Sequence, residues 1–234
     1  MTDIVYKACG MYIVELKRLP DTITNEGRNG VVDRNYAKFR GNKFFVHSIK
    51  HKITNESISE IENTSYSYKK IKYIVGEEIS TEFCENLNKI CAEGIHFFTS
   101  FDDAYYYIDN IKNGIRKQWH ATGRQSQIYN YKDDDLDGEY KAWHYNGEQS
   151  KNYNYKDGVV DGECKEWHCN GKQSKIYNYK YGNLDGECKQ WYCDGKQSII
   201  YNYKDGKLDG VCKEWYCDGN QSKICNYKDG NIDG

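Results

Sequence analysis

The sequence predicts a small α+β domain over residues 1–112, followed by an all-β array of stacked antiparallel β-hairpins over residues 113–234. Three observations favour this division. The second half repeats with a period of 24 residues, and a short fixed period is typical of repeat arrays. Helical periodicity is confined to the first half. Each repeat carries one tryptophan at the same position, namely Trp119, Trp143, Trp167, Trp191 and Trp215.

The composition argues against a nucleic-acid-binding protein. The formal net charge is −2, and lysines alternate with acidic residues along the repeats, whereas phosphate contacts need an excess of Lys and Arg. The N-terminus lacks a basic segment followed by an apolar core, so we expect no signal peptide. No run of about 18 apolar residues could span a membrane. We therefore expect a cytoplasmic protein whose ten cysteines stay reduced.

The first half opens with β-type sequence. Residues 4–19 contain two apolar runs separated by a glycine, and residues 37–50 predict a pair of strands joined at Gly41-Asn42. Residues 53–67 carry little apolar content and predict a loop. Residues 68–75 alternate between apolar and polar side chains, with Ile71, Tyr73 and Val75 on one face, and predict a half-buried strand.

Two helices are expected before the repeats begin. The first covers residues 83–91, where apolar residues at i, i+4, i+7 and i+8 form one stripe, between a cap at Ser80 or Thr81 and a stop at Gly94. A short strand over residues 95–99 follows.

The second helix covers residues 101–112. Ser100 with Asp103 resembles a capping box at its start. Asn113-Gly114 both ends this helix and opens the first repeat.

Each repeat contains two turn signals. One is Asn-Gly or Asp-Gly at residues 146–147, 170–171, 194–195 and 218–219, and the other is X-Gly at residues 157–158, 181–182, 205–206 and 229–230. Such dipeptides suit type I′ turns, in which both central residues need φ > 0. Two ten-residue arms and two two-residue turns account for the 24-residue period, so each repeat is predicted to be one hairpin.

Two-residue turns also predict a register. The expected pairs are Trp167 with Ser174, Cys164 with Tyr177, Tyr179 with Leu184, and Tyr177 with Gly186. One sheet face then carries the Tyr, Leu and first-Cys positions, and the other carries the Trp, Ile and second-Cys positions. A tyrosine ring lying over a cross-strand glycine would explain the Gly of each Asp-Gly pair.

The repeat with Asp-Gly, a Trp-Tyr pair, Asn-Gly and Asn-Tyr-Lys-Asp-Gly resembles the MORN repeat, in the variant of bacterial YwqK-type proteins, over residues 114–234. The first half is similar to an uncharacterised domain of giant viruses of the mimivirus type, which precedes such repeats. That similarity rests on Tyr6-Lys7-Ala8-Cys9, on residues 91–98, and on Ala104 and Tyr107. The resemblances imply an elongated sheet used for protein or membrane contact and no known reaction.

Histidines and cysteines in the repeats invite a metal-site interpretation, which we do not favour. His120, His144 and His168 share one repeat position, but Tyr192 and Tyr216 fill it later, and tyrosine is a poor substitute for a zinc ligand. Residues at equivalent positions also lie roughly 9.5 Å apart, two strands away. We expect packing roles for both residue types and no bound metal.

The aromatic ladders are the candidate binding residues. They comprise Trp119, Trp143, Trp167, Trp191, Trp215, Tyr153, Tyr177 and Tyr201. Most of these rings are expected to support a thin sheet, and the exposed remainder to form a binding face.

A second candidate site lies in the first half. Residues 94–107 resemble a strand-to-helix segment of ADP-ribosyltransferases, with His96 where that family has a Tyr that stacks on nicotinamide. Gly94, His96 and Tyr107 are the candidate residues of this alternative. The competing interpretation is a buried strand followed by a capped helix.

We therefore expect a non-catalytic scaffold without a cofactor, whose extended sheet binds a protein partner or, less strongly favoured, membrane phosphoinositides. The alternative is an ADP-ribosyltransferase-like enzyme in the first half, targeted by the repeats. An open last strand near Asp233 would also allow edge-to-edge self-association. If the protein is viral, we expect it in the host cytoplasm or in the virion.

Overall fold

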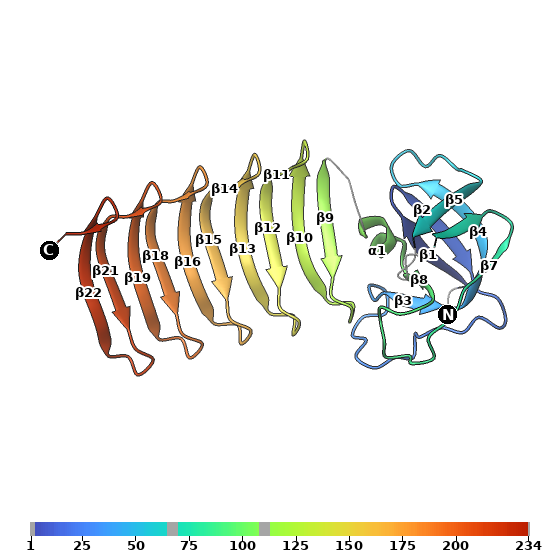
Figure 1. Cartoon of the computed structure of the whole chain (residues 1–234), viewed down its shortest axis with the longest axis horizontal. Helices are drawn as coiled ribbons and strands as arrows, with labels where there is room; N and C mark the ends of the chain where they lie inside the picture. The colour runs from blue at the N-terminus through green and yellow to red at the C-terminus, as the bar shows by residue number, and fades with distance from the viewer. Residues whose placement is uncertain (1–2, 65–69, 108–112, 234) are drawn as a thin grey trace. The chain divides into compact units, whose positions relative to one another are not determined.

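The structure, a computed structural model, describes residues 3–64, 70–107 and 113–233 (Figure 1). The chain divides into two compact units. Unit 1 comprises residues 1–110 and 117–124, and unit 2 comprises residues 111–116 and 125–234. The expected fold class is confirmed: the first unit mixes strands with a short helix, and the second is a regular antiparallel meander.

Unit 1 is built on a four-stranded antiparallel sheet. Its order is β1 (Ile4–Cys9), β2 (Tyr12–Lys17), β4 (Lys43–His51) and β7 (Glu78–Ser80). Two further pairs are β3 (Phe39–Gly41) with β8 (Ile95–Phe97), and β5 (Glu60–Thr64) with β6 (Lys70–Ile74). The core between them contains Val5, Val14, Leu16, Phe39, Phe44, Val46, Ile49, Tyr73, Ile95 and Phe97. The two β-type runs expected over residues 4–19 are confirmed as β1 and β2, which pair with each other.

The strand pair predicted around Gly41-Asn42 is wrong. Both strands exist, but β3 pairs with β8 and β4 pairs with β2 and β7. The chain turns a corner at Asn42, whose side-chain oxygen accepts the N–H of Ile23 at 2.8 Å. A Cβ on Gly41 would lie 2.6 Å from the Phe44 ring, so the corner packs directly onto the core and the two strands enter different sheets.

The loop predicted over residues 53–67 contains a strand. β5 forms a hairpin with β6, although its sequence, Glu-Ile-Glu-Asn-Thr, is mostly polar. Its one apolar residue, Ile61, packs against the core, and two ion pairs, Lys72 with Glu60 at 2.8 Å and Lys70 with Glu62 at 2.9 Å, lie across the two strands on the exposed side. A strand with a single apolar residue gives no apolar alternation, which is why the sequence pattern missed it.

The helix predicted over residues 83–91 is also wrong, because this segment has neither helix nor strand. It instead wraps around Arg40, which is fully buried in β3. The guanidinium donates to four main-chain carbonyls, those of Lys89 at 2.9 Å, Cys84 at 2.7 Å, Glu93 at 3.1 Å and Asn86 at 2.6 Å. In a helix, these carbonyls would accept hydrogen bonds from the backbone N–H groups of the same helix. The buried guanidinium of Arg40 requires hydrogen-bond acceptors, and the irregular backbone leaves the carbonyls free to provide them.

The helix α1 (Phe101–Tyr106) begins where the sequence predicted. Its N-cap is Ser100, whose side chain accepts the N–H of Asp103 at 3.2 Å. The helix is shorter than predicted, because it ends at Tyr106 and the backbone of the C-cap Tyr107 is extended, with φ −76° and ψ 115°. Residues 108–112 of the predicted helix lie outside the described residues. In the described part of the chain, no helix is long and apolar enough to cross a membrane.

The repeats form a 15-stranded sheet with three strands per repeat (Figure 1). The six-residue strands are β9 (Gly114–Trp119), β12 (Gly138–Trp143), β15 (Gly162–Trp167), β18 (Gly186–Trp191) and β21 (Gly210–Trp215). The eight-residue strands are β10 (Gln125–Lys132), β13 (Gln149–Lys156), β16 (Gln173–Lys180), β19 (Gln197–Lys204) and β22 (Gln221–Lys228). The two-residue strands are β11 (Asp135–Leu136), β14 (Val159–Val160), β17 (Asn183–Leu184), β20 (Lys207–Leu208) and β23 (Asn231–Ile232).

Only one of the two predicted turn types is type I′. At Tyr181-Gly182 both residues have positive φ, +51° and +80°, as type I′ requires. At Asn170-Gly171 only the glycine does. There the N–H of Gly171 bonds to His168 O at 2.9 Å, and the N–H of His168 bonds to Lys172 O at 2.8 Å. This is a type I turn followed by a left-handed glycine, in a five-residue loop.

The predicted register within a repeat is confirmed at two of the expected pairs and wrong at a third. Cys164 pairs with Tyr177, and Tyr179 pairs with Leu184, as expected. Trp167 pairs with Gln173 rather than with Ser174, because a β-bulge shifts the register there.

The pairing between neighbouring repeats is also shifted from the predicted one. Tyr177 was expected to face Gly186, but the residue that faces Gly186 is Tyr203 of the same repeat. The next repeat is joined through Lys175↔Gln190 and Ile176↔Lys189, two residues away from the predicted register. The second cysteine of each repeat, such as Cys169, lies exposed in the turn rather than on a sheet face.

Candidate functional site

A column of tyrosines lies beside a column of buried thiols in the repeat sheet. Tyr177 is directly opposite Cys164, and Tyr201 is directly opposite Cys188. These cysteines are 0% and 6% exposed, and burial raises the pKa of Cys164 to about 11. A thiol with a raised pKa is a weak nucleophile at neutral pH, and the buried Cys164 and Cys188 pack within the sheet.

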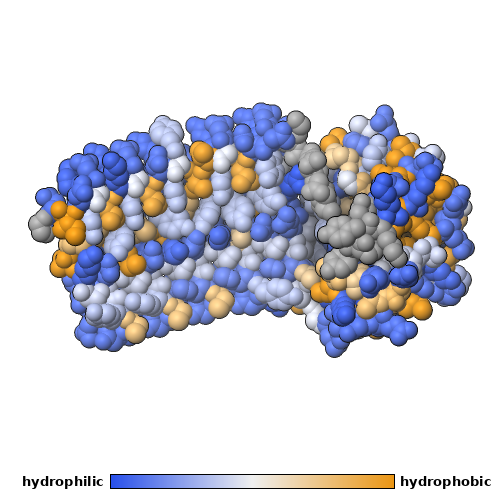
Figure 2. All heavy atoms as spheres, viewed as in Figure 1, coloured by the Kyte–Doolittle hydropathy of each residue, from blue (hydrophilic) through white to orange (hydrophobic). Residues whose placement is uncertain are grey.

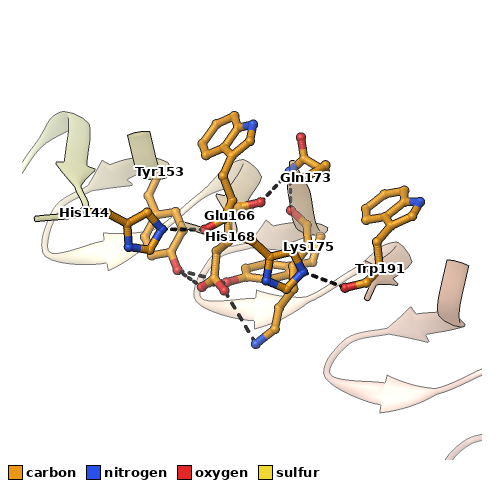
Figure 3. A network of polar contacts seen from close by, with 9 residues as sticks. His144, Tyr153, Glu166, His168, Gln173, Lys175 and Trp191 are labelled. Carbon is orange, nitrogen blue, oxygen red and sulfur yellow. Dashed lines mark hydrogen bonds and ion pairs between the residues drawn. The ribbon is translucent and has the colours of Figure 1, made fainter. Parts of the chain in front are cut away.

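Glu166 joins the tyrosines of two repeats in one polar network (Figure 3). The Tyr177 hydroxyl donates to Glu166 Oε1 at 2.6 Å, and the Tyr153 hydroxyl donates to the same oxygen. The two hydroxyls lie 2.9 Å apart, and the ammonium of Lys175 is 3.5 Å from the carboxylate. Because Tyr153 belongs to the preceding repeat, the network connects neighbouring hairpins across their boundary.

The electrostatics of this network favour a fixed ionisation state. Burial, then the hydrogen bond with Glu166, raises the pKa of both Tyr153 and Tyr177. Burial opposes ionisation of Glu166, but the two hydroxyls and the ammonium of Lys175 hold its pKa below the ordinary value. At neutral pH the tyrosines therefore remain hydrogen-bond donors and the glutamate remains their acceptor.

The same bridge recurs two repeats later. The Tyr201 hydroxyl donates to Glu214 Oε1 at 2.6 Å, and Lys223 lies 3.8 Å from that carboxylate. Gln190 occupies the position between Glu166 and Glu214. Sequence reasoning missed this position, although Glu or Gln precedes the tryptophan in four of the five repeats, with Ala142 as the exception, which was a signal that the position carries a polar side chain with a partner.

The histidine column holds successive repeats together. His144 Nε2 lies 2.8 Å from the carbonyl oxygen of Trp167, and His168 Nε2 lies 2.9 Å from that of Trp191 (Figure 3). Because a carbonyl only accepts, each Nε2 carries the proton. No group of three metal-ligating side chains occurs among the residues that the structure describes.

The tryptophan column is half-buried and borders a hollow. A hollow of about 650 Å³ lies along Trp191 and Trp215 and is lined as well by His168, Lys175, Tyr192 and Glu214, among others. The bulge residue Ser198 is 8% exposed and also contributes to its wall. We refer to this space as the tryptophan hollow. Figure 2 shows the hydrophobic residues of the array as small groups at regular intervals, separated by hydrophilic residues.

Trp119 differs from the later tryptophans because another ring already covers it. Within unit 1, Tyr36 stacks on its indole at a centroid distance of 4.9 Å and an interplanar angle of 10°. The backbone N–H groups of Val32 and Asp33 donate to Thr122 O at 2.8 and 3.0 Å. A segment of the chain thus docks on the Trp position and on the turn that follows it.

Three of the five lysines at one position of the six-residue strands are paired with a glutamate of the same strand, whereas Ile115 and Val211 stand in place of the glutamate before Lys117 and Lys213. Lys141 pairs with Glu139 at 2.8 Å, and the corresponding pairs in the next two repeats, Lys165 with Glu163 and Lys189 with Glu187, both measure 2.6 Å. Each partner is two residues away on the same strand and therefore on the same face.

The residues of the alternative site have structural roles in unit 1. His96 is 8% exposed, and its Nε2 lies 3.2 Å from Ile90 O. Burial, then the nearby lysines, lowers its pKa to about 3. A Cβ on Gly94 would meet the Arg40 side chain at 3.1 Å. The Tyr107 hydroxyl is bonded to the Lys38 ammonium at 2.7 Å, so the three residues do not line a common open site.

Comparison with known proteins gives a match in the first unit only. A family of unknown function (DUF5758) matches residues 2–104, which end inside α1 and before the repeats. No curated protein matches the chain. The N-terminal part is therefore similar to a family of unknown function, and it is followed by an array of stacked antiparallel β-hairpins.

Proposed function

We propose that the protein is a non-catalytic scaffold whose repeat sheet binds protein partners. One observation carries this proposal: side chains of the same kind recur at equivalent positions of successive hairpins, and bonds such as His144–Trp167 and His168–Trp191 hold those hairpins at a constant interval. A partner that also repeats can contact several hairpins at once, so that weak contacts add up to useful affinity.

The resemblance to MORN repeats of the YwqK type supports the same function. Such repeats imply an extended sheet used for contact with proteins or membranes. The similarity of the first half to a domain of giant viruses supports a viral source, with the protein in the host cytoplasm or the virion.

Protein partners are favoured over anionic lipids. A lipid-binding face needs free cationic side chains, but Lys165 and Lys189 are each paired with a glutamate at 2.6 Å. Releasing such a lysine to a phosphate would leave the glutamate facing the same anionic surface.

The ADP-ribosyltransferase-like alternative is less favoured. A ring that stacks on nicotinamide must present one face to the ligand, whereas His96 is 8% exposed. The Tyr107 ring is itself covered, with the Lys38 ammonium 4.8 Å from its centroid and Phe98 packed at 4.8 Å.

The test uses the full chain as bait in host-cell lysate, followed by cross-linking through lysines and mass spectrometry. The scaffold proposal expects a recovered partner to cross-link to Lys141, Lys165, Lys189 or Lys213. Cross-links confined to unit 1 would contradict the scaffold proposal. The matched variant is His96→Ala, which should leave partner capture unchanged. If the purified chain consumes a nicotinamide dinucleotide and His96→Ala abolishes that activity, the enzyme alternative is correct instead.

A further inference from the structure

The tryptophan hollow has the features of a recognition site rather than of a packing defect. It is bordered by two indoles and by the His168 and Tyr192 rings of the adjacent column. The bulge at each tryptophan, seen between Gln190 and Trp191, lets two residues of one strand oppose one of the other. Bulges of this kind re-aim side chains, and here the change is repeated in every hairpin from Trp143 to Trp215.

The hollow offers hydrogen-bond donors and no net charge. Lys175 is paired with Glu166 at 3.5 Å, and Glu214 is paired with Lys223 at 3.8 Å and with a tyrosine. In the described part of the chain, the indole nitrogens of Trp167, Trp191 and Trp215 make no hydrogen bond, and they are not among the buried nitrogens that lack a partner. Solvent-accessible indole N–H groups suit a neutral ligand that is rich in acceptors.

The chain itself shows which kind of ligand the Trp position accepts. At Trp119 the occupant is a polypeptide segment, which stacks the Tyr36 ring flat on the indole and bonds through its backbone to Thr122. This contact lies within unit 1. It favours a polypeptide over an oligosaccharide, another class of ligand that commonly stacks on aromatic rings.

The spacing of the indoles selects the conformation of that polypeptide. Equivalent residues of neighbouring repeats are two strands apart, roughly 9.5 Å. A polyproline II helix has three residues per turn and rises about 3.1 Å per residue, hence about 9.3 Å per turn. It has no internal hydrogen bonds, so its carbonyls are free to accept from indole N–H groups, and proline-rich segments dock on aromatic-lined grooves.

We propose that Trp167, Trp191 and Trp215 bind a proline-rich segment of a partner protein in the polyproline II conformation, with one turn per repeat. Proline rings at every third residue lie against successive indoles, and the peptide carbonyls accept from the indole N–H groups. This inference rests on the proposed scaffold function and names the chemistry of the partner.

The test is calorimetric titration of the full chain with synthetic peptides of three, six and nine residues that carry proline at every third position. The expected result is saturable binding whose affinity rises at least about ten-fold from the shortest to the longest peptide, because each added turn reaches another indole. Trp191→Phe keeps a ring but removes the N–H, and it should weaken binding of the longest peptide about five-fold or more.

Trp119→Phe is the matched control, because Tyr36 already covers that indole, and it should leave the affinity unchanged. Circular dichroism and thermal unfolding of each variant check that the fold is retained. The proposal is overturned if no peptide binds at millimolar concentration, if both variants weaken binding equally, or if a β-1,4-linked oligosaccharide binds in place of the peptides. A partner that cross-links to the array and is insensitive to Trp191→Phe would leave the scaffold standing and refute this inference.

Discussion

The Tyr192 hydroxyl donates a 2.7 Å hydrogen bond to the main-chain carbonyl of Trp215, one repeat after His168 makes the same contact with Trp191 at 2.9 Å. Two chemically different rings therefore reach equivalent groups across equivalent repeat boundaries. The interchange of His and Tyr at this position is explained by their shared ability to donate to a carbonyl.

Exchanging these rings should cost little stability, whereas removing the donor should cost more. We expect His168→Tyr to change the free energy of unfolding by less than about 0.5 kcal/mol and His168→Leu to lower it by about 1 kcal/mol. Urea denaturation measures both. Tyr192→Phe removes only the hydroxyl and should resemble His168→Leu. A Leu variant as stable as the unaltered protein would show that the hydrogen bond contributes nothing.

Glu166 should stabilise the array through its charge. Its pKa is held below the ordinary value in the fold, so its contribution is present above the unfolded-state pKa and is lost as pH falls through the folded pKa. We expect Glu166→Gln to lower the free energy of unfolding by about 1 kcal/mol at pH 7 and the difference to shrink below about pH 4. Urea midpoints between pH 7 and pH 3 test this. The exposed pair partner Glu163 supplies the control, Glu163→Gln, with an effect below about 0.5 kcal/mol.

Arg40 should be the most sensitive single position of unit 1. Arg40→Met would leave a cluster of carbonyls without their donor, and we expect a loss of about 3 kcal/mol or more. Arg40→Lys keeps the charge but has fewer donors in a different geometry, so it should fall in between. Hydrogen exchange over residues 82–94 should accelerate in both variants. Arg34→Met, at an exposed arginine with one bond to Glu26 O, is the control and should have a small effect.

Tyr181 is a position where a substitution should make the protein more stable. It is 75% exposed and has φ of +51°, whereas the equivalent Asp157, Asp205 and Asp229 are of a residue type that tolerates positive φ better. We expect Tyr181→Asp to raise the free energy of unfolding by about 0.5 kcal/mol. Gly182→Ala should lower it by about 1 kcal/mol, since φ is +80° there while the nearest atom, on Val159, leaves ordinary room for a Cβ. Thermal unfolding distinguishes the two directions.

Asp103 should make unit 1 less stable as pH rises. Burial raises its pKa to about 8, above its unfolded value. Its contribution is therefore complete below about pH 4 and is lost as pH rises towards 8. Asp103→Asn should remove this slope from the stability profile between pH 4 and pH 8. The neighbouring, exposed Asp102 gives the control, because Asp102→Asn should leave the slope in place.

The repeat fold was predictable because short local sequence signals determine each hairpin, and these signals recur in every repeat. Glycine dipeptides at fixed intervals predicted the hairpins. The predicted pairing of Cys164 with Tyr177 is correct because the β-bulge next to Trp167 offsets the loop being longer than two residues. The bulge at Ser174 and the two-residue shift between hairpins were not predictable, because they depend on how neighbouring repeats pack. The network around Glu166 joins two repeats, so no single repeat reveals it.

In unit 1, prediction from the sequence failed where a residue distant in the chain determines the local structure. Residues 83–91 have helical spacing, yet their carbonyls are used by Arg40, more than forty positions earlier in the chain. β5 has a single apolar residue, Ile61, which packs against the core formed by other strands, so no apolar alternation marks it as a strand. By contrast, the cap at Ser100 was predictable because it acts only three residues ahead.

The bond from each His or Tyr to the next tryptophan carbonyl has a genetic consequence. Donor and acceptor are 23 residues apart, as in His144 with Trp167 and Tyr192 with Trp215. A tandem duplication or deletion of one repeat's coding sequence therefore adds or removes a donor together with an acceptor and leaves every remaining pair intact. The length of the array can evolve in whole units without a compensating mutation, so gene copies of different length should each encode a continuous sheet.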